Sequence, residues 1–327
     1  MAGPQRSAVA GILLRVLPGL LLLGVFEAGL RAFGLPRFDA CWAPAEEWRR
    51  EPDPELGWVL EPGRRIGAAV ANERGMRGPV LPAEKAPAHY RILYVGDSTC
   101  FGLGVALEES FAARASALVQ TARPEAIVEY EIAAVPGYSS YHARVLVRRM
   151  VPAQHPDLVV LFVGAHNDHS RARYYPDAAI PERLARRHAR WHGVATLRFL
   201  EALGDQFHRL ALRKLRSPAA AARVPPAAFR KNLDDMLERI REAGAVALVL
   251  SPPFSQALRA HHPTVPSYRE ALRDAALAEG ARLVDLDPLF RARAEGEVFL
   301  PDGFHFTETG HAIAARAIAD AVPANGP

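Results

Sequence analysis

The stretch Arg91-Ile92-Leu93-Tyr94-Val95-Gly96-Asp97-Ser98-Thr99-Cys100-Phe101-Gly102 decides how this chain is interpreted. Its short apolar run, residues 92–95, predicts a buried strand. Gly96 has no Cβ, so the backbone can turn sharply there, and a helical pattern resumes near Ser110. Ser98 is therefore expected just past the carboxyl end of a strand, where open α/β sheets gather their ligands. By itself Gly-Asp-Ser is a weak signal, because such tripeptides commonly form polar turns.

Strand-like and helical patterns alternate outward from this stretch. Such alternation predicts a three-layer α/β/α fold with a central parallel sheet. Strands are expected over 92–95, 127–135, 158–163, 246–250 and 282–286. Helices are expected over 110–121, 141–151, 229–243, 268–279 and 307–321, the last with Thr307 as its N-cap.

A possible partner for Ser98 lies near the carboxyl terminus, where Asp302 and His305 are three residues apart ahead of a helix. In that arrangement the carboxylate can accept a hydrogen bond from one imidazole nitrogen, and the other nitrogen can take the serine proton. An isolated pair of this kind would indicate only a capping turn. With Ser98 in the same domain, the pair is interpreted as a base and the residue that orients it.

Acyl transfer also requires hydrogen-bond donors for the oxyanion. Gly137 follows the second strand, and its N–H can approach a ligand closely because no side chain intervenes. Asn167 follows the third strand, and its amide can donate, although asparagine in a turn often bonds only its own backbone. Both residues are expected at the same edge of the sheet as Ser98.

These four blocks resemble the SGNH (GDSL-like) hydrolase superfamily. The resemblance covers residues 90–322 and implies the flavodoxin-like fold of that family, with no cofactor and no metal. It also implies that Ser98 is the nucleophile, His305 the base and Asp302 its orienter. The Ser98 N–H, the Gly137 N–H and the Asn167 side chain would form the oxyanion hole. Thr99 and Ala165 depart from the usual pattern, which has leucine and glycine at those places.

Other interpretations compete at single residues. Cys100 is a second possible nucleophile near the same strand end, but packing is the favoured interpretation, and whether Cys41 and Cys100 pair is left open. Asp285 and Asp287 are alternative orienters of the histidine, although ending a strand is favoured for both. Three further residues are of types that can bind a metal, but their spacing matches no known metal site, so a metal site is not favoured. They are His166, Asp168 and His169.

The amino-terminal part of the chain is expected to lie outside the hydrolase domain. Residues 8–26 are almost wholly apolar, which predicts an uncleaved transmembrane anchor within residues 1–34, with a cleaved signal peptide as the alternative. Residues 35–88 are rich in proline, glycine and charge and are expected to form a strap or linker; residues 56–58 and 72–78 resemble the strap of bacterial membrane-anchored members. The hydrolase domain is expected over 89–323.

Within that domain, residues 170–224 form a basic insertion too long for a simple strand-to-helix loop. A solvated helical insertion is favoured, and a cap that meets anionic substrate or lipid is the alternative. The chain has 327 residues and a net charge of +4, which favours anionic neighbours, and no nucleic-acid-binding module is visible.

Together these features predict a serine esterase on the extracytoplasmic side of a bacterial inner membrane, acting on a small-molecule, glycan or lipid acyl ester. An O-acyltransferase with the same triad and a catalytically silent glycan-binding module are the alternatives, and secretion after signal cleavage is the alternative location.

Overall fold

A computed structural model describes residues 4–35, 50–51, 53–172, 175–187, 193–214 and 222–322. Its centre is a sheet of five parallel strands in the order β6-β5-β7-β8-β9. The strands are β5 (His89–Gly96), β6 (Ile127–Ala134), β7 (Leu158–Phe162), β8 (Val246–Ser251) and β9 (Arg282–Asp285). The predicted parallel sheet is thus confirmed.

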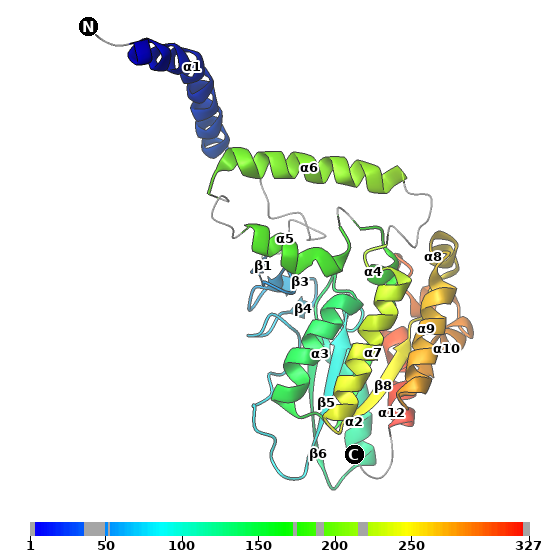
Figure 1. Cartoon of the computed structure of the whole chain (residues 1–327). Coiled ribbons are helices and arrows are strands. Elements are labelled where there is room, and N and C mark those ends of the chain that lie inside the picture. The colour runs from blue at the N-terminus through cyan, green and yellow to red at the C-terminus, as the bar shows by residue number, and fades with distance from the viewer. Residues whose placement is uncertain are drawn as a thin grey trace.

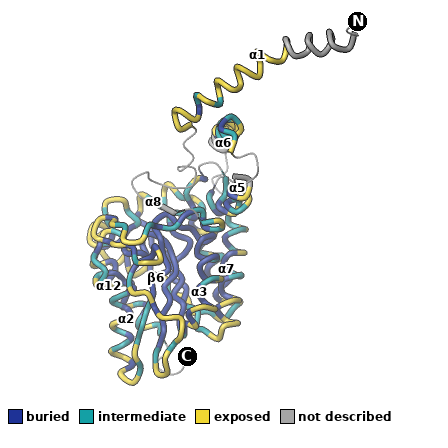
Figure 2. The backbone as a smooth tube through the Cα atoms, turned by 90° about the vertical axis from the view of Figure 1, so that its left-hand side faces the viewer, coloured by how far each residue is buried: buried dark blue, intermediate teal, exposed yellow. Residues whose placement is uncertain are grey.

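Helices cover both faces of this sheet (Figure 1). On one face α2 (Phe111–Ala122) packs against α12 (Glu308–Ala321). On the other, α7 (Pro226–Glu242) lies between α3 (Ser140–Gln154) and α9 (Val265–Ala278). Figure 2 shows the strands as the buried layer between the two sets of helices. β5 contains the predicted apolar run 92–95, and it is buried because helices cover both of its faces.

Short elements surround this core. Before the sheet lie β1 (Arg50–Glu51), β2 (Val59–Leu60), β3 (Arg65–Ile66) and β4 (Ala69–Val70), which form two antiparallel pairs. The turns and short helices are η1 (Leu107–Glu109), α4 (His166–His169), η2 (Asp177–Ala179), α8 (Gln256–His261), α10 (Asp287–Arg291) and α11 (Glu295–Val298). In the basic insertion the structure describes α5 (Ile180–Arg187) and α6 (Ala195–Lys214). The favoured interpretation of a helical insertion agrees with these two helices.

The amino-terminal helix α1 (Pro4–Ala32) projects away from the domain (Figure 1). Between Arg15 and Glu27 its apolar run covers residues 16–26, which is shorter than the roughly 20 residues that a bilayer requires. Among the described residues, no helix combines the length and apolarity needed to cross a membrane. The predicted transmembrane helix is therefore not supported.

Candidate active site

Three side chains that lie far apart in the sequence meet at the carboxyl edge of the sheet. The Oγ atom of Ser98 lies 2.8 Å from Nε2 of His305, and Nδ1 of His305 lies 2.7 Å from Oδ2 of Asp302. With its Nδ1 proton directed to the carboxylate, His305 presents Nε2 as an acceptor to the serine hydroxyl. Ser98 and His305 are both buried. The geometry is that of a nucleophile, a base and an orienting carboxylate.

The turn that carries Asp302 and His305 is fixed by its own backbone. Oδ1 of Asp302 accepts hydrogen bonds from the backbone N–H groups of Phe304 and His305, at 3.1 and 3.0 Å. Gly303 has a φ of +79°, and a Cβ there would lie 2.4 Å from Oγ of Ser255. The turn therefore needs glycine both for its left-handed backbone and for the close approach of Ser255.

Asp302 is held in its ionised form. Partial burial opposes ionisation, but the hydrogen bonds from the His305 ring and from the two backbone N–H groups outweigh it, and the pKa of Asp302 falls to about 2. The carboxylate is thus charged at neutral pH, which suits a group that must stabilise a transient imidazolium.

The loop after β5 presents Ser98. The backbone N–H of Thr99 donates to Oδ1 of Asp97 at 2.8 Å, and the carbonyl of Ser98 accepts from the N–H of Leu103 at 3.0 Å. Burial raises the pKa of Asp97 to about 6, although the Thr99 N–H and the nearby His305 act in the opposite direction. Asp97 thus holds the turn through its hydrogen bond with Thr99, although burial disfavours its ionised form.

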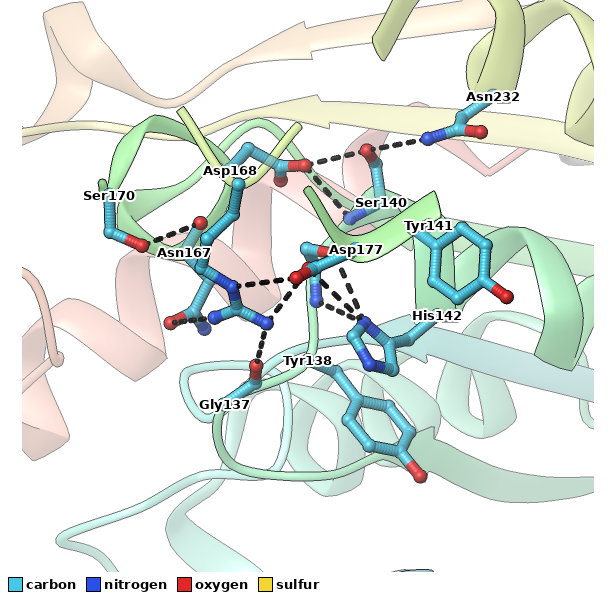
Figure 3. A network of polar contacts seen from close by, with 12 residues as sticks. Gly137, Tyr138, Ser140, Tyr141, His142, Asn167, Asp168, Ser170, Asp177 and Asn232 are labelled. Carbon is cyan, nitrogen blue, oxygen red and sulfur yellow. Dashed lines mark hydrogen bonds and ion pairs between the residues drawn. The ribbon is translucent and has the colours of Figure 1, made fainter. Parts of the chain in front are cut away.

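Two of the three predicted oxyanion-hole residues, Gly137 and Asn167, share one partner, Arg223. Its Nη2 donates to the carbonyl oxygen of Gly137 at 2.9 Å, and its Nη1 donates to Oδ1 of Asn167 at 3.4 Å. The same guanidinium also donates from Nε to Oδ1 of Asp177 at 3.1 Å. Figure 3 shows Gly137, Asn167 and Asp177 converging on this point. Because Oδ1 of Asn167 faces Arg223, the Nδ2 donor of the same amide points away from that guanidinium.

Asp168 ties together the loops that carry these residues. It is buried and accepts hydrogen bonds from the N–H and Oγ of Ser140, at 2.9 and 2.6 Å, and from the N–H of Gly164 at 3.0 Å. Asp168 therefore joins the start of α3, where it contacts Ser140 (Figure 3), to the loop after β7. Gly164 has a φ of +79°, and a Cβ there would lie 2.9 Å from the Phe229 ring. Gly164 thus takes the left-handed position, while Ala165 is accommodated as the N-cap of α4.

The structure disfavours the competing nucleophile Cys100 and pairs the competing orienters Asp285 and Asp287 with arginines. Cys100 is a buried free thiol, and burial raises its pKa, which disfavours the thiolate that a nucleophile needs. Cys41 lies outside the described residues, so its pairing stays open. Asp285 accepts two hydrogen bonds from Arg269, each 2.6 Å, and Asp287 accepts from Arg259 at 2.8 and 3.0 Å.

The histidines near Asn167 have separate partners. Nδ1 of His166 lies 3.1 Å from Nε2 of His262, and the His166 ring stacks on Phe304 with its centroid 4.5 Å away. His169 contacts Oγ1 of Thr264 and the carbonyl oxygen of Gly164, at 3.1 and 3.0 Å. Burial lowers the pKa of His166 to about 4 and that of His169 to about 3. Both rings are therefore neutral at physiological pH.

Sequence reasoning missed Arg223 and Phe304 as neighbours of the site, and it considered His166 only as one of three residues of types that can bind a metal. Phe304 carried a weak signal, because it lies between Asp302 and His305. Arg223 carried none, because it is one of many arginines in the basic insertion.

Comparison with known proteins gives one match in sequence. A profile of the GDSL-like lipase/acylhydrolase family matches residues 94–313. That range includes Ser98, Asp302 and His305, and also Gly137, Asn167 and Arg223. A search of curated protein sequences finds no match.

Solved structures with a similar fold include an acetylxylan esterase from Geobacillus stearothermophilus (17% identity, 73% of this chain and 96% of that chain, TM-score 0.47). They also include a lipase/acylhydrolase from Enterococcus faecalis (18% identity, 71% and 94%, TM-score 0.46). A third is the structure of TesA (17% identity, 71% and 97%, TM-score 0.46). At this level of identity the likeness concerns the fold alone.

Proposed function

Because the chain belongs to the GDSL-like lipase/acylhydrolase family, we propose that Ser98, His305 and Asp302 form a catalytic triad that cleaves an acyl ester through an acyl-enzyme. The expectation of an ester-hydrolysing serine hydrolase is confirmed by this family assignment. The observation that carries the triad is the continuous chain of contacts from Asp302 through His305 to Ser98, at 2.7 and 2.8 Å.

In the proposed reaction, Ser98 Oγ bonds to the acyl carbon while Nε2 of His305 takes the hydroxyl proton. The carbonyl π bond then re-forms, the ester C–O bond breaks, and the alcohol leaves with that proton. Water repeats the sequence on the acyl-enzyme and releases the acid. The backbone N–H groups of Ser98 and Gly137 and the side chain of Asn167 are the proposed donors to the oxyanion.

Arg223 is proposed as a positioning residue for this oxyanion hole. It holds the Gly137 carbonyl and Oδ1 of Asn167 with one planar guanidinium. A planar fork fixes both acceptors at once, which a point charge on a flexible stem cannot do. The Nδ2 donor of Asn167 is then oriented before the substrate arrives.

An active-site probe tests the nucleophile. A fluorophosphonate should label Ser98, and Ser98→Ala should lose both labelling and at least about 10³-fold in hydrolysis of aryl esters. The exposed Ser267 provides the control, because Ser267→Ala should retain labelling and activity. Undiminished labelling of the Ser98→Ala protein would contradict the assignment. A panel of acyl chain lengths, assayed with and without a sugar alcohol, would then separate hydrolysis from acyl transfer.

The extracytoplasmic location belongs to the same proposal, and its support is the apolar segment of residues 8–26. That segment suits a signal peptide, whose apolar region is shorter than a membrane-crossing helix. Amino-terminal sequencing of the mature protein tests this: a new amino terminus near residue 30 would support it, and full-length protein found only in the cytosol would contradict it.

A further inference from the structure

The helix α6 is amphipathic, but its apolar side faces away from the protein instead of toward the core. Its large apolar side chains recur at intervals of three and four residues and are between 44% and 65% exposed. That spacing places them on one face of a helix. The residues are Leu197, Leu200, Leu203, Phe207 and Leu210, and we call them the α6 stripe.

The polar side of α6 packs inward. Arg183 of α5 pairs with Asp205 and lies 3.5 Å from Glu201. Tyr175 donates to Oδ1 of Asp205 at 3.0 Å and stacks on His208, with ring centroids 4.3 Å apart. These contacts fix which side of α6 faces the protein, so the exposure of the stripe follows from specific polar contacts beneath it.

A second set of contacts joins α6 to α1. Glu27 of α1 accepts hydrogen bonds from the N–H groups of Ala195 and Thr196, at 2.8 and 2.7 Å, and thereby caps the first turn of α6. Those bonds, together with Arg31, lower the pKa of Glu27 to about 2. Phe26 packs edge-on against Phe199 at 5.6 Å. α1 also carries exposed apolar side chains of its own, which include Leu20, Leu21, Leu22 and Val25.

Charge distinguishes between possible occupants of this surface. The helices α5 and α6 together carry seven arginines and lysines against three carboxylates. A second copy of the same helices would bring like charges together, whereas anionic lipid head groups would be attracted to them. A basic helix with one apolar face is suited to lie along a membrane surface, with that face at the boundary of head groups and acyl chains.

We propose that the α6 stripe lies in the surface of an anionic lipid membrane. This binding requires no helix to cross the bilayer. In Figure 1, α6 lies on the side of the domain that carries α4, where the sheet has its carboxyl edge. Lipid contact through the stripe would therefore place that edge on the membrane side. The proposal does not depend on the catalytic roles of Ser98 and His305.

An environment-sensitive label tests the proposal in the full chain. Leu200→Cys and Phe207→Cys are each made in a Cys41→Ser background and labelled with a nitrobenzoxadiazole dye, since Cys100 is buried. With vesicles of phosphatidylglycerol and phosphatidylcholine, both labels should shift to the blue and be quenched by doxyl groups on the acyl chains. The shift should weaken in high salt and with phosphatidylcholine alone.

Leu277→Cys is the matched control, because Leu277 is 81% exposed and lies on α9. Its label should stay accessible to aqueous iodide in the same vesicles. Equal iodide quenching at positions 200 and 277 would overturn the proposal. A blue shift without lipid that grows with protein concentration would also overturn it, in favour of a second copy of the chain.

Discussion

Arg223 is the residue whose proposed role is most directly testable, because it contacts two of the three predicted oxyanion-hole residues, Gly137 and Asn167. Asn167→Ala should cost about 10²–10³ in kcat with KM little changed, since the lost donor acts in the transition state. Arg223→Lys keeps a charge beside Asp177 but lacks the fork. It should lower kcat by about tenfold or more, with little change in melting temperature.

The double variant separates positioning from a general structural role. If Arg223 acts through the amide of Asn167, then Arg223→Lys should add little to the loss already present in Asn167→Ala. Steady-state kinetics of the four proteins completes this cycle. Fully additive losses in kcat would show that Arg223 acts by another route.

Asp97 predicts a pH dependence of stability. Its pKa is about 6 in the folded protein, against 3.8 for the unperturbed group. The folded state therefore holds the proton more tightly, so Asp97 lowers stability as the pH rises from about 4 to about 6. Asp97→Asn stays neutral and can still accept from the Thr99 N–H. The variant should gain stability relative to wild type across that range, by at most about 3 kcal/mol. Denaturant unfolding at each pH measures this, and a gain independent of pH would contradict the assignment.

At the scale of single elements, the end of β5 tolerates no side chain at Gly96. A Cβ there would lie 2.6 Å from Cβ of Cys100 and 2.8 Å from the carbonyl oxygen of Phe162. Because both neighbours belong to the packed sheet edge, Gly96→Ala should destabilise the fold by roughly 1–3 kcal/mol. It should also displace Ser98 and reduce activity.

Gly296 in α11 is the matched control, because a Cβ there meets nothing within 4 Å. Gly296→Ala should leave activity intact and stability equal or slightly higher, since alanine favours a helix. Thermal unfolding and ester hydrolysis of the two variants decide the matter. If Gly96→Ala behaved like Gly296→Ala, the strand end would be less tightly packed than described.

At the scale of the whole molecule, the segment before the sheet braces the loop after the proposed nucleophile. Arg77 is buried, and its guanidinium donates to the carbonyl oxygens of Phe101, Gly102 and Val105, at 2.7, 2.5 and 2.7 Å. Buried carbonyls left without donors are costly, at about 1–3 kcal/mol each. Residues 53–88 are therefore more than a linker, because one of their side chains completes the hydrogen bonding of the loop.

Arg77→Met should accordingly lower the free energy of unfolding by roughly 3 kcal/mol or more, and reduce kcat by loosening the loop. The exposed Arg65 in β3 provides the comparison, and Arg65→Met should change neither quantity appreciably. Denaturant unfolding and steady-state kinetics check both. Unchanged stability in Arg77→Met would mean that water or another donor replaces the guanidinium.

Local patterns in the sequence are enough to predict the alternation of strands and helices, the parallel sheet, and Ser98, Asp302 and His305 as site residues. These depend on local signals: the apolar run of β5, the close spacing of Asp302 and His305, and the cap at Thr307, which accepts from the N–H of Gly310 at 3.2 Å. Strands in such an alternation end at a common edge, so the meeting of the serine with the histidine follows from topology.

Three features depend on contacts between distant parts of the chain: the arginine that contacts the site, the side chain that braces the loop after β5, and the direction in which the α6 stripe faces. Arg223 is 86 residues from Gly137, and Glu27 is 168 residues from Ala195. The arginines of a basic segment cannot be told apart by sequence, because their roles depend on which of them the fold buries against other residues. Likewise, the spacing of apolar residues in α6 predicts that they share one face of the helix. Only the contacts of Arg183 and Tyr175 with Asp205, on the opposite face, show that the apolar face points outward.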